Sequence, residues 1–311
     1  MNKPFSTIPF FTIAFSGLAL LAANAWAAEG RPINETRPLK ADARLSVSNV
    51  SGSIEVETWG KNEMQLTGTL APEVERLVIE GDADSLTIEV KLPKRSRRTG
   101  DTILKLKVPA GIALQAEGVS ADIKARGLKG PIEASSVSGD ITLDVASERV
   151  EAESVSGDVA VTAPTTEVRV ETVSGDVTLR GGKGEVRSES VSGTVKVEAR
   201  DVRRLDAESV SGDLSFDLQL ARDAEVSVET LSGEVLMVLP SLPDLDLDFE
   251  TFSGDLESAF GELVSETHSR KHHDDEDDDD DERSKHYRRH GSGRGHMHLQ
   301  SFSGDIILKK K

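Results

Sequence analysis

The chain has 311 residues, of which 55 are acidic and 37 are basic, so its formal net charge is −18 at neutral pH. Such a surface repels nucleic acid and anionic membranes overall, and we expect no nucleic-acid partner. Cysteine is absent, which excludes disulfides, thiolate zinc sites and a cysteine nucleophile.

The first residues have the pattern of a secretory signal. Lys3 precedes an apolar run over residues 8–23, and Ala25 and Ala27 suit cleavage after residue 27. The run is short for a bilayer span of about 20 residues, so we interpret 1–27 as a cleaved signal peptide rather than a retained anchor. The sequence predicts an exported chain with no integral membrane span. The periplasm is favoured, with the cell surface and the medium as alternatives.

Residues 28–110 contain irregularly spaced stretches of alternating polarity, such as 45–48, 86–90 and 103–108. We expect these stretches to be strands of an irregular β capping region. A basic loop interrupts them, and its candidate anion-binding residues are Lys94, Arg95, Arg97 and Arg98. The functional interpretation is contact with an anionic envelope glycan or lipid headgroup. The alternative is a solvated loop balanced by acidic neighbours.

A short phrase, apolar-Ser-Gly-acidic-apolar, recurs along the rest of the chain. An early copy contains Gly52; from Gly139 the glycines follow one another after 18 to 21 residues up to Gly254, and a last copy comes 50 residues later. A period this short is typical of a solenoid. We interpret the phrase as a tight turn formed by Gly52, Gly139, Asp140, Gly157, Asp158, Gly175, Asp176, Gly193, Gly212, Asp213, Gly233, Gly254, Asp255, Gly304 and Asp305.

On both sides of each turn the residues alternate between small or apolar and polar, as in 150–154 and 159–162. Period-two alternation rich in valine indicates strands. The predicted fold class is therefore all-β, with residues 111–264 forming a β-solenoid of stacked two-strand rungs. An antiparallel β-meander is the alternative. We favour the solenoid because equivalent positions, such as Val159, Val177 and Val195, keep similar residues.

Stacking the repeats creates columns of equivalent residues. The residue before each Ser-Gly turn forms an apolar pre-turn column of Val155, Val173, Val191, Val210, Leu231, Phe252 and Phe302. Strict alternation would point this column outward, but we favour a bulge that turns it into the core, because soluble proteins rarely expose so long an apolar patch. If it is exposed, it is the best partner-binding surface of the chain. The acidic columns are expected to cap turns and face solvent, with bound Ca²⁺ as the alternative.

Residues 265–295 form a low-complexity tract that is expected to be a disordered loop, followed by a final β rung over 296–311. All seven histidines lie between 268 and 298, so the folded body is expected to lack histidine. The candidate ligands for Zn²⁺ or Cu²⁺ are His268, His272, His273, His286, His290, His296, His298, Asp274 and Asp275. A solvated polar loop is the alternative, and no cofactor is expected to be required. The lysines at 309–311 are expected to protect the end of the stack.

The signal peptide, the early Val50-Ser51-Gly52, the segment 108–111 and the serial Ser-Gly-Asp strands resemble a bacterial β-strand-repeat family. That family has no known function and is commonly labelled "putative adhesin". The resemblance covers nearly all of the mature chain and implies a right-handed β-solenoid-like envelope protein without established catalytic residues. The charged tract at 265–295 departs from the family pattern.

The sequence thus favours a non-catalytic exported β-solenoid of the bacterial cell envelope, an adhesin-like binding or scaffold module. Its partner would be an envelope component, either a protein or an anionic glycan. One alternative is a periplasmic metal-binding protein that presents the His- and Asp-rich loop. Another is a polysaccharide-active β-solenoid enzyme. The carboxylates, however, form even columns without a distinguished pair, and aromatic sugar platforms are scarce.

Overall fold

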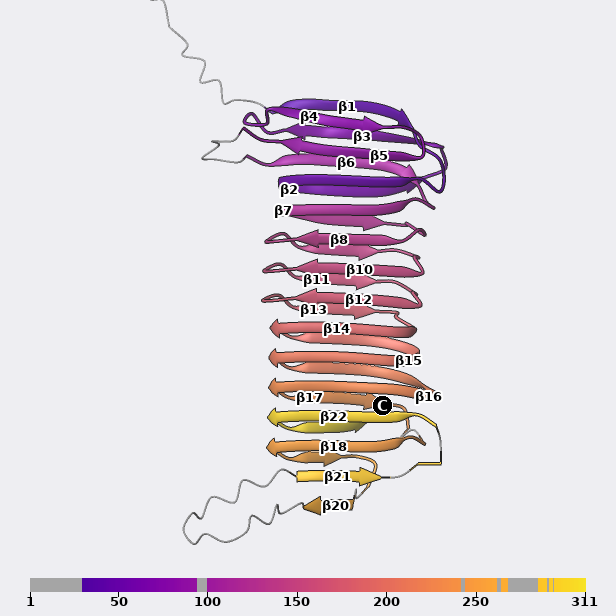
Figure 1. Cartoon of the computed structure of the whole chain (residues 1–311), viewed down its shortest axis with the longest axis vertical. Helices are drawn as coiled ribbons and strands as arrows, with labels where there is room; N and C mark the ends of the chain where they lie inside the picture. The colour runs from indigo at the N-terminus through magenta and orange to yellow at the C-terminus, as the bar shows by residue number, and fades with distance from the viewer. Residues whose placement is uncertain are drawn as a thin grey trace, which may run out of the picture.

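The computed structural model describes residues 30–93, 100–241, 244–261, 264–267, 285–289, 291–292 and 294–311. Over these residues the regular structure consists of 23 strands in one continuous sheet, which winds into an elongated body (Figure 1). No helix among the described residues is long and apolar enough to cross a membrane.

The strands fall into three groups along the chain. The first group is β1 (Arg31–Pro38), β2 (Arg44–Trp59), β3 (Glu63–Leu70), β4 (Arg76–Gly81), β5 (Ser85–Lys91), β6 (Thr102–Pro109) and β7 (Ala113–Arg126). The central repeats are β8 (Ile132–Ser136), β9 (Ile141–Asp144), β10 (Arg149–Ser154), β11 (Val159–Thr162), β12 (Glu167–Thr172), β13 (Val177–Arg180), β14 (Gly184–Ser192), β15 (Val195–Ser211) and β16 (Leu214–Ser232). The last group is β17 (Val235–Leu239), β18 (Asp246–Ser253), β19 (Leu256–Ser258), β20 (Val264–Thr267), β21 (Lys285–Arg289), β22 (His296–Ser303) and β23 (Ile306–Lys310).

The repeats stack in parallel, one repeat per rung. Val150 of β10 is the register partner of Val168 in β12, which in turn is the partner of Val186 in β14. The second strand of each repeat follows the same rule, because β11 pairs in parallel with β9 and β13. The β-solenoid prediction is therefore confirmed. Antiparallel pairing occurs, among the described strands, at the two ends of the stack.

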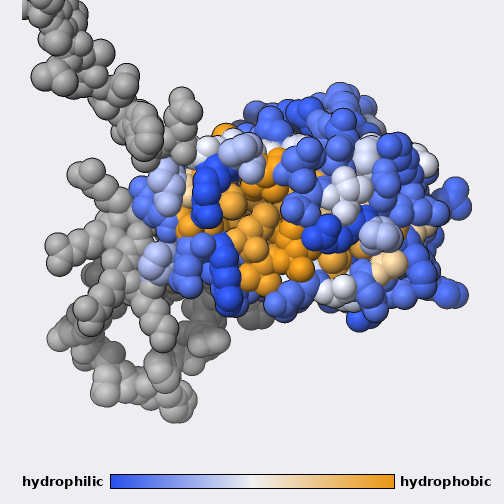
Figure 2. All heavy atoms as spheres, turned by 90° about the horizontal axis from the view of Figure 1, so that it is seen from above, coloured by the Kyte–Doolittle hydropathy of each residue, from blue (hydrophilic) through white to orange (hydrophobic). Residues whose placement is uncertain are grey.

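The core lies inside the winding sheet because the strands of the repeats alternate between the two sides. In β10, Val150 and Ala152 are buried whereas Glu151 and Glu153 are not. The same alternation in every rung produces one apolar core along the whole body. Viewed from the N-terminal end, apolar side chains occupy the centre and hydrophilic ones surround them (Figure 2).

Antiparallel strands close both ends of the parallel stack. At the N-terminal end, β2 pairs with β7 on one side and with β5 and β6 on the other, and β4 and β3 then add to β5 and β6 in the antiparallel sense. At the C-terminal end, β21 pairs antiparallel with β18, and β20 with β21. Within 265–295 the structure thus describes strand residues 265–267 and 285–289, while 268–284 lie outside the described residues.

The last rung of the chain is not the last rung of the stack, and the expectation that 296–311 would close the body is wrong. β22 lies between β16 and β18, and β23 lies between β17 and β19 (Figure 1). Met297 and Leu299 of β22 are fully buried between apolar side chains of β16 and β18. This burial explains the insertion, because the rung contacts core on both sides. The expectation that the lysines at 309–311 protect the end of the stack is wrong as well, because β23 pairs with β17 on one side and β19 on the other.

Engineered cysteine pairs test this rung order without interference, because the natural chain has no cysteine. Glu229 and Gln300 are register partners, so their Cα atoms are about 5 Å apart, within the range of a disulfide. Glu250 is the partner of Gln300 on the far side and lies about 10 Å from Glu229. We expect the Glu229→Cys/Gln300→Cys variant to oxidise fully and Glu229→Cys/Glu250→Cys to keep free thiols, as measured by thiol titration. The reverse result would show stacking in chain order.

Candidate functional site

The Ser-Gly-Asp turns align at one corner of the body, and their acids bind backbone rather than one another. The Asp140 Oδ1 accepts a hydrogen bond of 3.0 Å from the amide of Asp158, and the Asp158 Oδ1 accepts one of 2.9 Å from Asp176. The Asp176 Oδ1 accepts from the Thr194 amide at 2.8 Å. Each of these carboxylates therefore holds the turn of the next rung in place. Ca²⁺ binding to the acidic columns stays a prediction.

The turn glycines are required mainly by the close approach of successive rungs. A Cβ atom on Gly157 would lie 2.2 Å from the Gly139 carbonyl oxygen, and one on Gly175 would lie 2.1 Å from that of Gly157. Positive φ angles contribute only in some rungs, for example 131° at Gly193 and 146° at Gly233. The turn glycines are thus explained by contact between rungs more than by backbone conformation.

The pre-turn column is exposed, and the predicted bulge that would bury it is wrong. Val155, Val173 and Val191 are 43–46% exposed, Val210 is 47%, and Leu231 is 54% exposed. The strands keep strict alternation up to the turn, so the hydroxyl residue before each valine points inward instead. In β10 it is Ser154, whose Oγ accepts a 2.9 Å hydrogen bond from the Gly157 amide. The hydroxyls of Ser136 and Thr172 accept the same bond from their turn glycines, so in these three rungs a capping bond stabilises the buried polar side chain.

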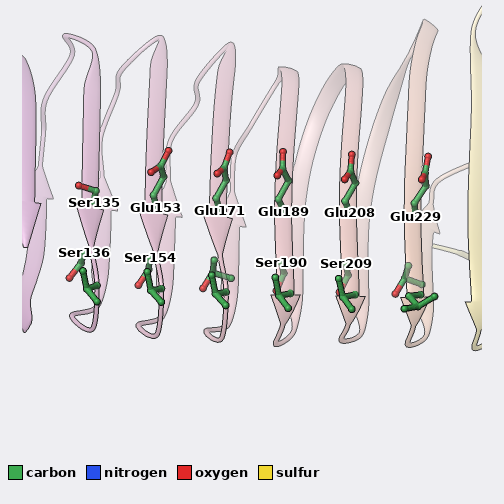
Figure 3. A pocket seen from close by; sticks show the side chains of 18 of the residues that line it. Ser135, Ser136, Glu153, Ser154, Glu171, Glu189, Ser190, Glu208, Ser209 and Glu229 are labelled. Carbon is green, nitrogen blue, oxygen red and sulfur yellow. The ribbon is translucent and has the colours of Figure 1, made fainter. Parts of the chain in front are cut away.

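The pre-turn column, together with Val137 one rung earlier, forms one wall of a groove of about 820 Å³ that runs along the stack. We call this groove the valine-glutamate groove. Figure 3 shows its other wall, where acidic side chains of successive rungs repeat at one position of the strand. The lining residues are Gly118; the polar column Ser135, Glu153, Glu171, Glu189, Glu208, Glu229 and Gln300; the hydroxyl column Ser136, Ser154, Thr172, Ser190, Ser209 and Thr230; and the apolar column Val137, Val155, Val173, Val191, Val210, Leu231 and Phe302.

The inserted C-terminal rung extends this groove. It places Phe302 directly beyond Leu231, and the Phe302 ring stacks on that of Phe252 with centroids 4.7 Å apart. Gln300 carries no charge, and on its far side its register partner is Glu250 of β18. The inserted rung therefore interrupts the column of carboxylates, whereas the apolar wall continues through Phe302 and Phe252.

The carboxylates of the groove are only partly neutralised. Arg169 binds Glu171 and lies 3.8 Å from Glu189, which also pairs with Arg187 at 2.7 Å. Partial burial raises the pKa of Glu153, and repulsion from the Glu171 and Glu151 carboxylates raises it further. A raised pKa means that the ionised form is less stable here than in water. A cation in the groove would relieve this repulsion.

Three buried hydroxyls beneath the groove lack hydrogen-bond partners: Ser190, Ser209 and Thr230. In their rungs the glycine amide donates to a backbone carbonyl of the neighbouring rung, as from Gly212 to Ser232 at 3.0 Å. In the earlier rungs the same amide donates to the hydroxyl, as from Gly175 to Thr172 at 3.1 Å. The turn thus changes its bonding pattern along the stack while the groove keeps its side chains.

The structure brings two of the predicted metal ligands into the folded body. His296 and His298 lie on β22, so the expectation of a histidine-free body is wrong. Together with Asp248 of β18, a residue that the sequence prediction missed, they place three ligand atoms within 4.8 Å of one another. The signal was available in the His-x-His spacing, which puts both side chains on one side of a strand. The sequence pattern did not indicate that β18, which carries Asp248, would pair with β22.

Other predicted site residues cannot be placed. His268, His272, His273, His290, Asp274 and Asp275 lie outside the described residues, as do Lys94, Arg95, Arg97, Arg98 and the signal segment 1–27. His286 lies in β21. Two lysines that flank this basic loop in the sequence pair with glutamates, Lys91 with Glu89 at 3.1 Å and Lys105 with Glu55 at 3.3 Å.

Comparison with known proteins identifies the family, because the profile of the Toastrack family (DUF4097) matches residues 43–309. The chain belongs to the Toastrack family. This is a bacterial family of unknown function, and the resemblance inferred from the turns is thereby confirmed. No curated protein matches the sequence.

Two solved structures resemble this Toastrack chain. A "putative lipid binding protein" from Parabacteroides distasonis has 14% sequence identity and a TM-score of 0.49, with 91% of this chain and 98% of that chain covered. A "putative cell adhesion protein" from Clostridium sporogenes has 11% identity and a TM-score of 0.21, with 90% and 100% covered. At these identities and TM-scores, neither name transfers to this chain.

Proposed function

We propose that this Toastrack protein is an exported, non-catalytic binding module of the bacterial envelope whose valine-glutamate groove holds a cationic amphipathic helix of a partner protein. One observation carries the proposal: a continuous exposed apolar column runs beside a column of carboxylates. Export is supported by the signal pattern of residues 1–27. Long exposed apolar patches mark interaction sites in soluble proteins.

Charge complementarity supports a cationic occupant. The groove carries Glu153, Glu171, Glu189, Glu208 and Glu229, whereas the arginines that neutralise it are Arg169 and Arg187. Apolar side chains of a ligand would cover the valines, and its lysines or arginines would reach the glutamates two positions away on the same strands. An anionic glycan would meet like charge here, so we assign the groove to a basic protein segment.

The spacing of the rungs supports a helical rather than an extended segment. Neighbouring strands lie about 4.8 Å apart, so the valine column offers one apolar contact per 4.8 Å. A helix presents its apolar stripe once per turn of about 5.4 Å, whereas an extended peptide repeats a face about every 6.6 Å. From Val137 to Leu231 the column spans about 24 Å, which matches a helix of about 16 residues.

The groove does not have the features of a catalytic site. The carboxylates recur once per rung along one wall, at the even spacing of the strands, so no two of them face each other across the groove as an acid and a base. Among the described residues that line it, none is a histidine or a lysine. These features support binding rather than turnover.

Titration with a designed peptide tests the proposal. The probe is an 18-residue peptide with leucines along one helical stripe flanked by lysines, and the comparison peptide has the same composition in strict Leu-Lys alternation. We expect micromolar binding of the first peptide by calorimetry, and helix formation in the circular dichroism difference spectrum of the mixture minus its separate components. The alternating peptide is expected to bind at least tenfold more weakly. Equal or tighter binding of that peptide would reject the helical occupant.

Matched variants locate the binding. We expect Val173→Ser/Val191→Ser and Glu153→Gln/Glu208→Gln each to weaken binding about tenfold, or about 1.4 kcal/mol. The controls are Ile103→Ser, which removes an exposed apolar residue outside the groove, and Glu198→Gln, which removes a charge from the other strand of a rung. The controls should bind like wild type. If the groove variants do so as well, the proposal fails.

A further inference from the structure

The inserted C-terminal rung creates a cluster of metal-ligating side chains from distant parts of the sequence. β22 has β16 on one side and β18 on the other. His296 and His298 are two residues apart on β22 and so project from the same side of the sheet. Asp248 is the register partner of His298 on β18. The stacking of two rungs therefore assembles two imidazoles and one carboxylate.

The geometry points to a divalent metal site formed by Asp248, His296 and His298, and we propose that it binds Zn²⁺. The ligand atoms of the three residues lie within 4.8 Å of one another. The His298 Nδ1 is 3.9 Å from the Asp248 Oδ2, and the two imidazole rings are nearly parallel, 8° apart, with centroids separated by 6.5 Å. Ligand atoms around a tetrahedral zinc ion are about 3.3 Å apart. Side-chain rotations that shift these atoms by about 1 Å bring them to that distance.

The surroundings of Asp248 prepare its carboxylate for this role. Its Oδ1 is buried and accepts no hydrogen bond, although the Arg288 Nε lies 3.5 Å away across the β18–β21 pair. Arg288 thus balances the side of the carboxylate that faces away from the histidines. The Oδ2 faces His298 and can bind an ion.

The neighbouring acids have other partners. The Asp246 Oδ1 accepts a hydrogen bond from the Gly291 amide at 3.0 Å, and Glu225 pairs with Arg204 at 3.3 Å. Among the residues that the structure describes, the site therefore offers three protein ligands, and solvent would complete the coordination of a bound ion. Two imidazoles with one carboxylate form a donor set typical of zinc sites that keep an open position.

A bound ion would connect two rungs that the chain joins only through a long excursion. Asp248 belongs to the outermost rung, and both histidines belong to the inserted one. Because binding requires both rungs in register, Zn²⁺ would stabilise this end of the body against fraying. None of the three residues lines the valine-glutamate groove, so the site does not depend on the function proposed for that groove.

Calorimetric titration of Zn²⁺ into the full-length protein after EDTA dialysis tests the site. We expect micromolar binding at a one-to-one ratio and a melting temperature several degrees higher with 100 µM Zn²⁺, about 100 times a micromolar Kd. In His298→Ala and Asp248→Asn we expect affinity to fall at least tenfold and the thermal shift to disappear. Circular dichroism without metal verifies that both variants fold.

A paired control separates this site from the histidine-rich tract. His272→Ala/His273→Ala removes as many imidazoles as His296→Ala/His298→Ala but leaves the β22 ligands intact. The first variant should keep the tight site, and the second should lose it. Loss in the first with retention in the second would overturn the proposal and assign binding to the tract. Retention in both, or no tight binding by wild type, would also overturn it.

Discussion

Replacing Gly157 by alanine is expected to lower the free energy of unfolding by about 3 kcal/mol or more. The new Cβ would lie 2.2 Å from the oxygen and 2.6 Å from the carbon of the Gly139 carbonyl. The obstacle is backbone on a neighbouring rung, which is itself fixed by hydrogen bonds to the rung beyond it. Relief therefore requires two rungs to separate, whereas a flexible side chain could simply rotate away.

Thermal unfolding followed by circular dichroism measures this effect, and we expect the melting temperature to fall by roughly 5–10 °C. Gly60→Ala is the matched control, because nothing lies within 4 Å of the position that its Cβ would take. That variant should melt within about 1 °C of wild type. If Gly157→Ala were equally harmless, the close contact between rungs would be disproved.

Truncating Phe216 to alanine is expected to cost about 3–5 kcal/mol. Phe216 is fully buried in β16, and its register partners in the adjacent rungs are Val197 and Met237. The parallel ladder on both sides prevents the rungs from collapsing into the space that the ring leaves. A cavity therefore remains, and Phe216→Leu should recover most of the loss. Chemical denaturation of the three proteins measures these differences.

Phe302→Ala is the informative comparison for Phe216→Ala. Phe302 is 50% exposed in the pre-turn column and stacks on Phe252, so its truncation should cost about 1 kcal/mol. A loss as large as that of Phe216→Ala would mean that the pre-turn column is buried after all.

The solenoid and its turns could be predicted from the sequence because their determinants are local and repeated. Val150 and Ala152 alternate with glutamates, and this period is enough to place them inside. Serine and glycine at each turn, followed in most turns by aspartate, mark where the chain reverses. The candidate site could be predicted only in part. The sequence identifies the pre-turn column but favours a position in the core, whereas the column lies on the surface.

That error has a physical cause. Placing Val155 outside leaves Ser154 inside, and a buried hydroxyl is unfavourable unless it is hydrogen-bonded. The bond from the Gly157 amide to the Ser154 Oγ meets this requirement, but it depends on the turn geometry. Period-two alternation was therefore the correct guide, and the general rule against exposed apolar patches was misleading here.

The sequence by itself determined the strands, their period, the residues of the turns and the family, because these depend on neighbours within one repeat. Only the tertiary structure decided the order of the rungs and the partner of the histidines. All rungs offer nearly the same apolar edge, so the pattern does not specify which rung lies beside which. Contacts such as those of Leu299 with both adjacent rungs make that choice, and with it Asp248 comes to lie beside His298.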